Sequence, residues 1–310
     1  MPDTVVMKFG GILVGSRNWT DSVTGTALVS ALRAAGREGA RIAPLLTSDQ
    51  EGGEFRALAD LPPEQTELDI GNAGDVRAAE SWAQDAAAAL RTAGFDLDLF
   101  PVADVATLTS PLGDRAFSDD TRTVSDLTVA ALRGCRDAGL ACAPLHFPGL
   151  GAASQDTDRG PATVSLDEAS LASRDLPPFE AAFRAKAPAV VLSLAFYAAY
   201  DPVTPGALSS LIATGLLRDQ LGYDGVAITD DLDAGAVRSS YSVRQAAVAA
   251  LAAGADLLQV DSPDDIDPAR KAILDAVSSG ELTNERLEEA AGRVLELKRK
   301  LGLLDEQTGG

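Results

Sequence analysis

Acidic residues and one histidine stand directly after apolar segments of this chain. Asp49 and Glu51 follow one such segment, His146 follows a second, and Asp230 follows a third. Carboxylates and imidazoles at the ends of buried strands can act as nucleophiles, as acids and bases, or as hydrogen-bonding groups for a polar ligand. His146 is the only histidine, which excludes metal sites built from several histidines and every Ser-His-Asp triad that does not use His146.

The elements that must position these residues alternate between short apolar runs, typical of strands, and longer helical stretches. Strands that are apolar throughout, with helices between them, indicate a parallel sheet covered on both faces. Seven such strands favour an α/β barrel over a doubly wound sheet, and polar residues after the strand ends would then form the catalytic face. We therefore predict one TIM-type (β/α)8 barrel domain over residues 1–310. The expected strands are residues 10–15, 42–48, 97–103, 142–147, 189–195, 225–229 and 256–260.

The composition argues against several classes of partner. The formal net charge of −20 repels phosphate backbones, so we expect no nucleic-acid binding. No run of about 18 apolar residues is present, which argues against a membrane span. The first residues lack the basic segment, apolar stretch and cleavage site of a signal peptide, so we expect a cytoplasmic protein.

The two cysteines and the scattered aspartates do not suggest a metal. Cys135 falls in a predicted helix and Cys142 in the strand that follows it. We therefore expect no disulfide framework, and two thiols without histidines do not make a zinc site. One histidine with scattered aspartates is not a dense ligand set either, so we expect no metal and no other cofactor.

Three motifs in order show a family resemblance. They are Asp49-Gln50-Glu51-Gly52-Gly53, His146-Phe147-Pro148-Gly149 and Ile228-Thr229-Asp230-Asp231-Leu232. The chain resembles the barrel domain of glycoside hydrolase family 3, closest to its single-domain β-N-acetylhexosaminidase branch. The likeness runs from about residue 10 to about residue 302. Supporting segments are Phe100-Pro101-Val102-Ala103-Asp104-Val105, Arg115-Ala116-Phe117 and Leu221-Gly222-Tyr223-Asp224-Gly225-Val226.

The resemblance implies a retaining mechanism in which Asp230 attacks the anomeric carbon and a second group protonates the leaving oxygen. The alternative interpretation of Asp230 is a helix-capping carboxylate just past a strand. The resemblance also implies that Asp49 accepts hydrogen bonds from sugar hydroxyls. Its alternative interpretation is a cap or turn before Gly52-Gly53.

Three further family positions imply substrate contacts: Arg115, His146 and Asp156. Arg115 has an alternative interpretation as a surface ion pair with Asp114 or Asp119. His146, as an isolated histidine at a strand end, has an alternative interpretation as a structural residue.

Several expected polar residues have been replaced. Leu145 stands where the family has lysine, and Leu150 and Leu194 stand where it has histidines. The family loop Asp-Ser-His carries the acid/base histidine, and here that loop is Asp156-Thr157-Asp158. Leucine excludes water and offers only apolar surface, so these changes predict a mouth that is filled in or reshaped for an apolar ligand.

Two interpretations of the function remain open. In the first, the chain is an active glycoside hydrolase of altered specificity. Asp230 is the nucleophile, and Asp158 or another carboxylate is the acid, with its pKa raised in a drier pocket. In the second, it is a silent or repurposed barrel that binds or transforms a more apolar small molecule. Under both, we expect ordinary β-N-acetylglucosaminidase activity to be weak or absent.

The first strand-helix unit of the barrel is shortened or missing. Only residues 1–9 precede the first expected strand, and residues 5–8 are too short for a strand and its helix. A barrel with seven strands has an edge of unpaired backbone groups. We expect a short strand from residues 5–8 or a second copy of the chain to cover this edge, and therefore a homodimer.

Overall fold

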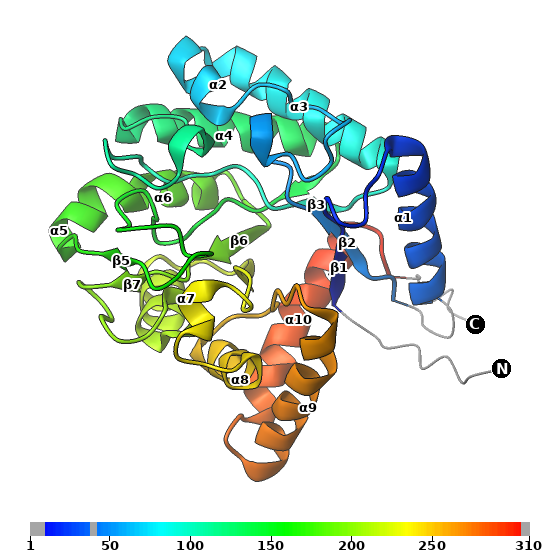
Figure 1. The fold of residues 1–310 in the computed structure, drawn as a ribbon, viewed down its shortest axis with the longest axis vertical. Helices are drawn as coiled ribbons and strands as arrows, with labels where there is room; N and C mark the ends of the chain where they lie inside the picture. Colours follow the sequence, from blue (N-terminus) through cyan, green and yellow to red (C-terminus); the bar gives the residue numbers. More distant parts are fainter. Residues whose placement is uncertain (1–9, 38–41, 305–310) are drawn as a thin grey trace.

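The computed structural model describes residues 10–37 and 42–304. Short parallel strands follow one another around the centre of the molecule, and helices lie outside them (Figure 1). The first four strands form one parallel sheet in chain order, and isolated parallel bridges extend it, from Phe147 to Leu192 and from Ile228 to Leu257. The strands of this arc are β1 (Gly11–Leu13), β2 (Leu45–Ser48), β3 (Leu97–Asp98), β4 (Ala141–Cys142), β6 (Ala189–Leu192) and β8 (Val226–Thr229).

The helices lie between successive strands along the chain, which is the order that a parallel α/β fold requires. The α-helices are α1 (Ser22–Arg37), α2 (Glu67–Ala73), α3 (Val76–Ala93), α4 (Thr121–Asp137), α5 (Glu168–Ser170), α6 (Leu176–Arg184), α7 (Gly235–Arg238), α8 (Val243–Ala253), α9 (Pro263–Ser279) and α10 (Asn284–Lys300). The 3-10 and π segments are η1 (Gly53–Phe55), η2 (Gly113–Arg115), η3 (Leu171–Asp175), η4 (Gly206–Leu208) and η5 (Leu211–Gln220).

The predicted fold class is confirmed: the chain is a TIM-type α/β barrel. All seven predicted strands coincide with a parallel strand or bridge of the arc, although most strands of the structure are shorter than predicted. A further parallel pair, β5 (Thr163–Val164) and β7 (Phe196–Tyr197), was not predicted. Each of these strands has two residues, and so short a segment leaves no periodic pattern in the sequence.

Local sequence explains where several helices begin. Thr66 and Asp69 form a reciprocal capping box at the start of α2, and Ser242 and Gln245 form another at the start of α8. Asp120 accepts a hydrogen bond from a backbone N–H in the first turn of α4. Each cap satisfies backbone donors that the helix itself leaves free and typically contributes about 1 kcal/mol.

Alternate residues of the strands pack into different cores. Leu45 of β2 and Ala141 of β4 belong to one buried cluster, whereas their neighbours Leu46 and Cys142 belong to another that includes Trp82 of α3. Successive side chains of a strand point to opposite faces. Each strand is therefore covered on both sides, which is why its sequence is apolar throughout.

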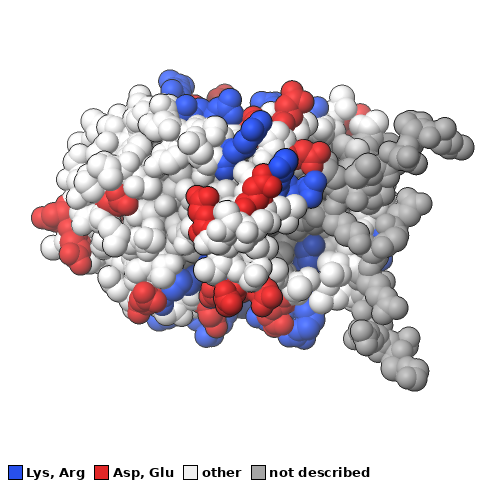
Figure 2. All heavy atoms as spheres, turned by 90° about the horizontal axis from the view of Figure 1, so that it is seen from below, with Lys and Arg blue, Asp and Glu red and all other residues white. Residues whose placement is uncertain are grey.

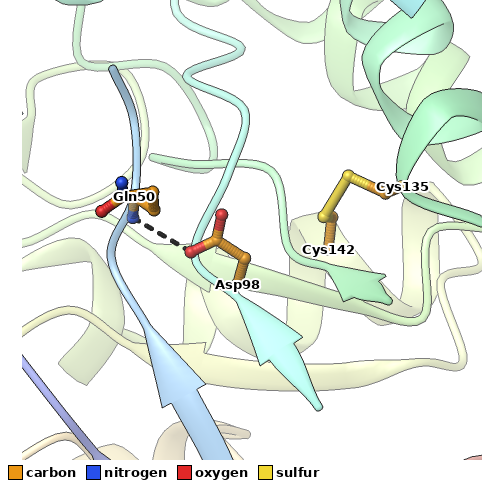
Figure 3. Close-up of a disulfide and its surroundings, with 4 residues drawn as sticks. All are labelled: Gln50, Asp98, Cys135 and Cys142. Atoms are coloured by element: carbon orange, nitrogen blue, oxygen red, sulfur yellow. Dashed lines mark hydrogen bonds between the residues drawn. A yellow bond between two sulfur atoms is a disulfide. The ribbon is translucent and has the colours of Figure 1, made fainter. Parts of the chain in front are cut away.

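The expectation about the cysteines is wrong, because Cys135 and Cys142 form a disulfide (Figure 3). Cys135 lies in the last turn of α4 and Cys142 in β4, and their Cα atoms are 6.3 Å apart. The chain reverses at Gly139, whose φ of 75° favours glycine, so a separation of seven residues still brings the two side chains face to face. Counting cysteines does not reveal such a local reversal.

The first strand of the described part has one strand neighbour, since β1 pairs with β2 alone among residues 10–37 and 42–304. A cavity of about 100 Å³ lies between β1 and the last strand segment of the arc. Residues 5–8, which are predicted to complete the barrel, lie outside the described residues, so that part of the prediction stays a prediction. The cavity is lined by Gly11, Leu13, Thr47, Leu99, Ile228, Leu257, Leu258, Gln259 and Val260.

Charged side chains on the surface are partly paired. Figure 2 shows one face on which acidic and basic groups lie side by side between uncharged areas. Helix α9 carries two exposed pairs, Arg270–Asp267 and Lys271–Asp275, which contribute little to stability. Within the described ranges, no helix is both long and apolar enough to cross a membrane. The expected cytoplasmic location stays a prediction.

We predict that the chain forms a homodimer near β1, because a strand edge without a partner invites pairing. Light scattering at micromolar concentration should give twice the mass of the 32.0 kDa chain, falling toward one chain on dilution. A constant mass of one chain, together with an experimental structure that contains a complete ring of eight strands, would contradict both halves of this prediction.

Candidate functional site

Candidate site residues follow the ends of four strands of the arc. Asp49 follows β2, Asp104 follows the β3 segment, His146 follows the β4 segment, and Asp230 follows β8 directly. The carboxyl ends of parallel strands open on one face of a barrel, which is where barrel enzymes carry their active sites. The fold therefore brings residues that are far apart in the sequence to one end of the molecule.

Asp104 holds the turn that carries His146. Its Oδ2 lies 2.8 Å from His146 Nδ1, and its Oδ1 accepts a hydrogen bond of 2.7 Å from the backbone N–H of Leu150. The backbone N–H of His146 lies 3.2 Å from the same carboxylate. Asp104 is fully buried, so these donors are its only means of stabilising a charge. With a carboxylate at Nδ1, that nitrogen keeps its proton and Nε2 faces the site.

The imidazole of His146 connects Asp230 and Arg115. His146 Nε2 lies 4.0 Å from Asp230 Oδ2 and 3.5 Å from Arg115 Nη2. Burial alone lowers the pKa of His146, but the charge and hydrogen bond of Asp104 outweigh it, so that the pKa is raised above its ordinary value of 6.5. His146 therefore favours the protonated form more than an exposed histidine does.

Asp230 is not a helix cap. The next helix, α7, begins five residues later and has Ala234 as its N-cap residue. The Asp230 side chain is 20% exposed, and its Oδ1 accepts a hydrogen bond of 2.8 Å from the backbone N–H of Asp231. The capping interpretation of this residue is therefore wrong, and one carboxylate oxygen remains available on the side of His146.

Arg115 pairs with Glu51, not with Asp114 or Asp119. Arg115 Nε and Nη2 donate to the two oxygens of Glu51 at 2.6 and 2.5 Å, in the forked geometry that suits a carboxylate. Burial alone lowers the pKa of Arg115, but the charge of Glu51 outweighs this effect, so that the pKa of Arg115 is raised above its ordinary value. The charge of Arg115 is thus largely neutralised before any ligand arrives. Glu51 is far from Arg115 along the chain, so no local pattern marks it as the partner.

Asp49 lies beside this pair with one oxygen unsatisfied. Its Oδ1 is fully enclosed and has no hydrogen-bond partner among the residues that the structure describes. Burial raises the pKa of Asp49 well above its ordinary value, repulsion by Glu51 raises it further, and the charge of Arg115 offsets part of the increase. Burying a carboxylate oxygen without a hydrogen-bond donor costs free energy. A hydrogen-bond donor of a ligand, or a proton on the carboxyl, therefore stabilises Asp49.

The segment that follows Asp49 is held by Gln50 and Asp98. The backbone N–H of Gln50 donates to Asp98 Oδ1 at 3.0 Å (Figure 3), and the Gln50 side chain donates to the carbonyl of Leu58 at 3.1 Å. Burial raises the pKa of Asp98 to about 8. Gln50 and Asp98 therefore fix the chain between Asp49 and Glu51.

The loop of Asp156 and Asp158 is attached to the helix that follows Asp230. The backbone N–H of Gly235 donates to the carbonyl of Asp158 at 3.1 Å, and that of Ala236 donates to Thr157 at 2.9 Å. A Cβ at position 235 would lie 2.7 Å from the carbonyl oxygen of Asp158, so the contact requires glycine. The loop and the Asp230 segment therefore share one anchoring point.

The carboxyl of Asp158 has a raised pKa. Although the residue as a whole is exposed, partial desolvation of its carboxyl is the largest cause; the charges of Asp230 and Asp156 raise the pKa further, whereas Arg115 and His146 lower it. Within the described part of the chain, no hydrogen bond or ion pair engages this carboxyl. Asp158 is therefore a free carboxyl close enough to Asp230 to feel its charge.

The three leucines at family polar positions lie in the core. Leu145, Leu150 and Leu194 are 4%, 3% and 0% exposed and belong to one buried cluster with Phe147. This packing favours a site entrance that is filled by the leucine side chains over an entrance that is open and lined by apolar groups. Their direct contact with a ligand stays a prediction, as do the binding roles of Asp49, Arg115, His146 and Asp156.

From the sequence, Asp104 and Glu51 were expected on the catalytic face without a specific partner, and Gly235 was not expected at the site. Asp104 was recognisable as a carboxylate after an apolar strand, but nothing marked it as the partner of His146. No group of three or more His, Cys, Asp and Glu side chains in the described ranges could hold a metal ion. The expectation that no metal is needed stays a prediction.

Sequence comparison gives a family for this arrangement. The family model described as "Glycosyl hydrolase family 3 N terminal domain" matches residues 4–297. The β-hexosaminidase of Stenotrophomonas maltophilia (strain K279a) is 35% identical over 275 residues, which are 85% of this chain and 79% of the relative. The β-hexosaminidase of Xanthomonas campestris pv. campestris (strain B100) is 32% identical over 301 residues, which are 95% of this chain and 84% of the relative.

Solved structures agree with these matches. A glycoside hydrolase family 3 β-N-acetylglucosaminidase from Paenibacillus sp. str. FPU-7 has a TM-score of 0.90 and 32% identity, over 97% of this chain and 59% of that one. This chain thus spans less than two thirds of that protein. A β-N-acetylhexosaminidase from Beutenbergia cavernae DSM 12333 has a TM-score of 0.84 and 31% identity, over 94% of this chain and 89% of that one.

We predict that Asp104→Asn lowers the pKa of His146 from above 6.5 to below it, because burial and the charge of Arg115 then act without the opposing carboxylate. His146 is the only histidine, so an untagged chain gives a single imidazole Hε1 signal, and its pH titration by NMR reports this pKa directly. The exposed Asp85→Asn on α3 is the matched control and should leave the titration unchanged.

The raised pKa of His146 in the wild-type chain has a consequence for the stability of the fold. Since the pKa in the folded chain lies above that of the unfolded chain, protonation of His146 favours folding. This contribution is complete below the unfolded value and is lost as pH rises through the folded value. A wild-type pKa at or below 6.5, or an unchanged pKa in a folded Asp104→Asn chain, would show that Asp104 does not control His146.

Proposed function

Because the chain belongs to glycoside hydrolase family 3, we propose that it hydrolyses an O-glycosidic bond with retention of configuration, using Asp230 as the nucleophile. The observation that carries this proposal is the position of Asp230 directly after β8, with an oxygen 4.0 Å from the imidazole that Asp104 orients. A carboxylate oxygen that faces the site is the group a retaining nucleophile needs.

In the first step, a carboxylate oxygen of Asp230 forms a bond to the anomeric carbon. The bond from that carbon to the leaving oxygen breaks, its electron pair stays on the leaving oxygen, and Asp158 supplies the proton. In the second step, Asp158 takes a proton from water, the water oxygen attacks the anomeric carbon, and Asp230 is released as a carboxylate. The protein ends the cycle in its original protonation state.

The raised pKa of Asp158 suits it to the role of acid. Burial and the charge of Asp230 both favour the protonated carboxyl, which the first step requires. Activity should therefore fall as pH rises through the pKa of Asp158. The attachment of the Asp158 loop to α7 supports this assignment, because α7 follows Asp230 closely and both carboxyls depend on the same segment.

The remaining polar residues are proposed to position the sugar. Asp49 and Asp156 would accept hydrogen bonds from hydroxyl groups, and Arg115 and His146 would donate them. Leu145, however, replaces a cation that the family resemblance places at the sugar. The loss of that cation supports a specificity different from that of the β-hexosaminidase relatives.

A second candidate function is a silent or repurposed barrel. The observation that favours it is the burial of Leu145, Leu150 and Leu194 in the core, where family members have polar groups. A filled mouth would leave less space for a sugar ring. A covalent label at Asp230 distinguishes the two functions, because only a retaining glycosidase forms it.

We predict that an activated 2-deoxy-2-fluoro glycosyl fluoride labels Asp230, because fluorine slows the second step more than the first and the glycosyl-enzyme accumulates. Mass spectrometry of peptides should locate one glycosyl group on Asp230. Asp230→Asn should remain unlabelled, and Asp85→Asn should be labelled like the wild type. If no sugar of a broad panel labels the folded protein, the second candidate function is favoured.

We predict that hydrolysis of an aryl β-N-acetylglucosaminide is far slower than the rate of about 10 per second that is usual for enzymes. The family imidazole is replaced by Asp158, and a general acid/base typically contributes about 10²–10⁴-fold. Asp158→His should raise the rate if the missing imidazole is the cause. Wild-type turnover at the usual rate would show that Asp158 or another group replaces the histidine fully.

A further inference from the structure

We propose that the site selects glycosides that carry a protonated amine at C2, that is 2-amino-2-deoxy glycosides, over the corresponding 2-acetamido and 2-hydroxy compounds. This inference rests on the proposed roles of Asp230 and Asp158, and it goes beyond them by naming the chemical class of the substrate. It follows from which charges around Asp230 have partners and which do not.

The two cations of the site are already paired. Arg115 is held by both oxygens of Glu51 at 2.6 and 2.5 Å. His146 is held by Asp104 at 2.8 Å. Each cation therefore contributes little net positive charge to the space in front of Asp230, because a carboxylate behind it cancels most of its field.

Three carboxylates around the same space have no such compensation. In the described part of the chain, Asp49, Asp158 and Asp230 form no ion pair with any lysine or arginine. Asp49 Oδ1 is enclosed without a hydrogen-bond partner. Asp230 accepts a backbone hydrogen bond at Oδ1 and faces the already paired His146 at Oδ2. When Asp49 and Asp158 are ionised, the described groups of the site therefore carry more negative charge than positive, and a bound cation stabilises these ionised forms.

Leu145 removes the cation that would balance this excess. Its side chain is apolar, 4% exposed and packed in the core, where it contributes neither charge nor hydrogen bonds. Arg159, beside the Asp156 loop, is exposed, and its Nε lies 3.8 Å from Asp156 Oδ2. Apart from protonation of the carboxyls themselves, a positive charge carried by the ligand can neutralise them.

The reaction geometry places that charge at C2. Asp230 must approach C1, and Asp158 must reach the leaving oxygen on C1. A substituent on C2 is one carbon away from the reacting centre, so it lies beside both carboxylates. An ammonium group is a compact charge with three donors, which matches several carboxylate oxygens. An acetamido group is neutral and larger, and it has a carbonyl oxygen that needs a donor of its own.

The protonation behaviour of the site agrees with this geometry. Burial is the main cause of the raised pKa of Asp49 and of Asp158, and the neighbouring charge of Asp230 raises both further. A bound ammonium would relieve this repulsion and lower both pKa values. Consequently, the alkaline limit of activity should lie at lower pH for an amino substrate than for a neutral one.

The test compares three 4-nitrophenyl β-D-glucopyranosides that differ only at C2: 2-amino-2-deoxy, 2-acetamido-2-deoxy and 2-hydroxy. At pH 6 and low salt, we expect kcat/KM for the amine to exceed that of both others by on the order of tenfold or more, the size expected for one screened charge contact. The preference should shrink at pH 9, where the amine is neutral. It should also shrink at high salt.

Matched variants separate a local from a general charge effect. Asp49→Asn removes a site carboxylate without changing its shape and should reduce the ratio of amine to neutral substrate severalfold. Asp85→Asn removes the same charge from the exposed side of α3 and should leave the ratio unchanged. An equal loss of preference in both variants would overturn the proposal, as would a wild type that uses all three substrates equally.

A binding measurement keeps this inference distinct from the proposed function. If none of the three substrates is hydrolysed, calorimetry with the same three compounds on the intact chain decides the matter. Preferential binding of the amine without hydrolysis would support the selectivity and contradict the glycosidase mechanism. Equal binding, or binding of the acetamido compound alone, would contradict the selectivity even if the protein proves to be an active glycosidase.

Discussion

The carboxylate of Asp104 is the group on which the geometry of the candidate site depends. It is fully buried, and it accepts hydrogen bonds from the ring and backbone of His146 and from the backbone of Leu150. These bonds fix the turn after β4 to the segment after β3. They also decide which imidazole nitrogen faces Asp230 and Arg115. The orientation of the other polar groups is defined relative to this ring.

Each of the two cationic side chains of the candidate site is paired with a carboxylate. Glu51 neutralises Arg115, and Asp104 neutralises His146. The cations therefore act as hydrogen-bond donors with a fixed direction more than as sources of positive field. Within residues 10–37 and 42–304, Asp49, Asp158 and Asp230 have no lysine or arginine partner, and we propose that these three groups face the ligand. A site of this kind discriminates through its carboxylates.

Much of the fold followed from the sequence, because apolar strands with polar residues at their ends have a strong pattern. The positions of Asp49, His146 and Asp230 after parallel strands were predictable for this reason. The partners were not, because the periodicity of a strand does not define distances across the top of a barrel. Arg115 was thus assigned to neighbouring aspartates, although it reaches Glu51 across 64 residues. The burial of the leucines likewise depends on packing, which single positions do not reveal.

The disulfide and Asp104 act on opposite ends of one strand segment. Cys142 joins its start to α4, and Asp104 holds its end at His146. Four residues of extended chain, about 13 Å, separate the two attachments. The disulfide is broken by reduction, whereas the pairing of Asp104 with His146 weakens as pH rises and the imidazole loses its proton. The α4–β4 connection therefore responds to the thiol balance of the surroundings, whereas the imidazole responds to acidity, and each sensitivity can change without the other.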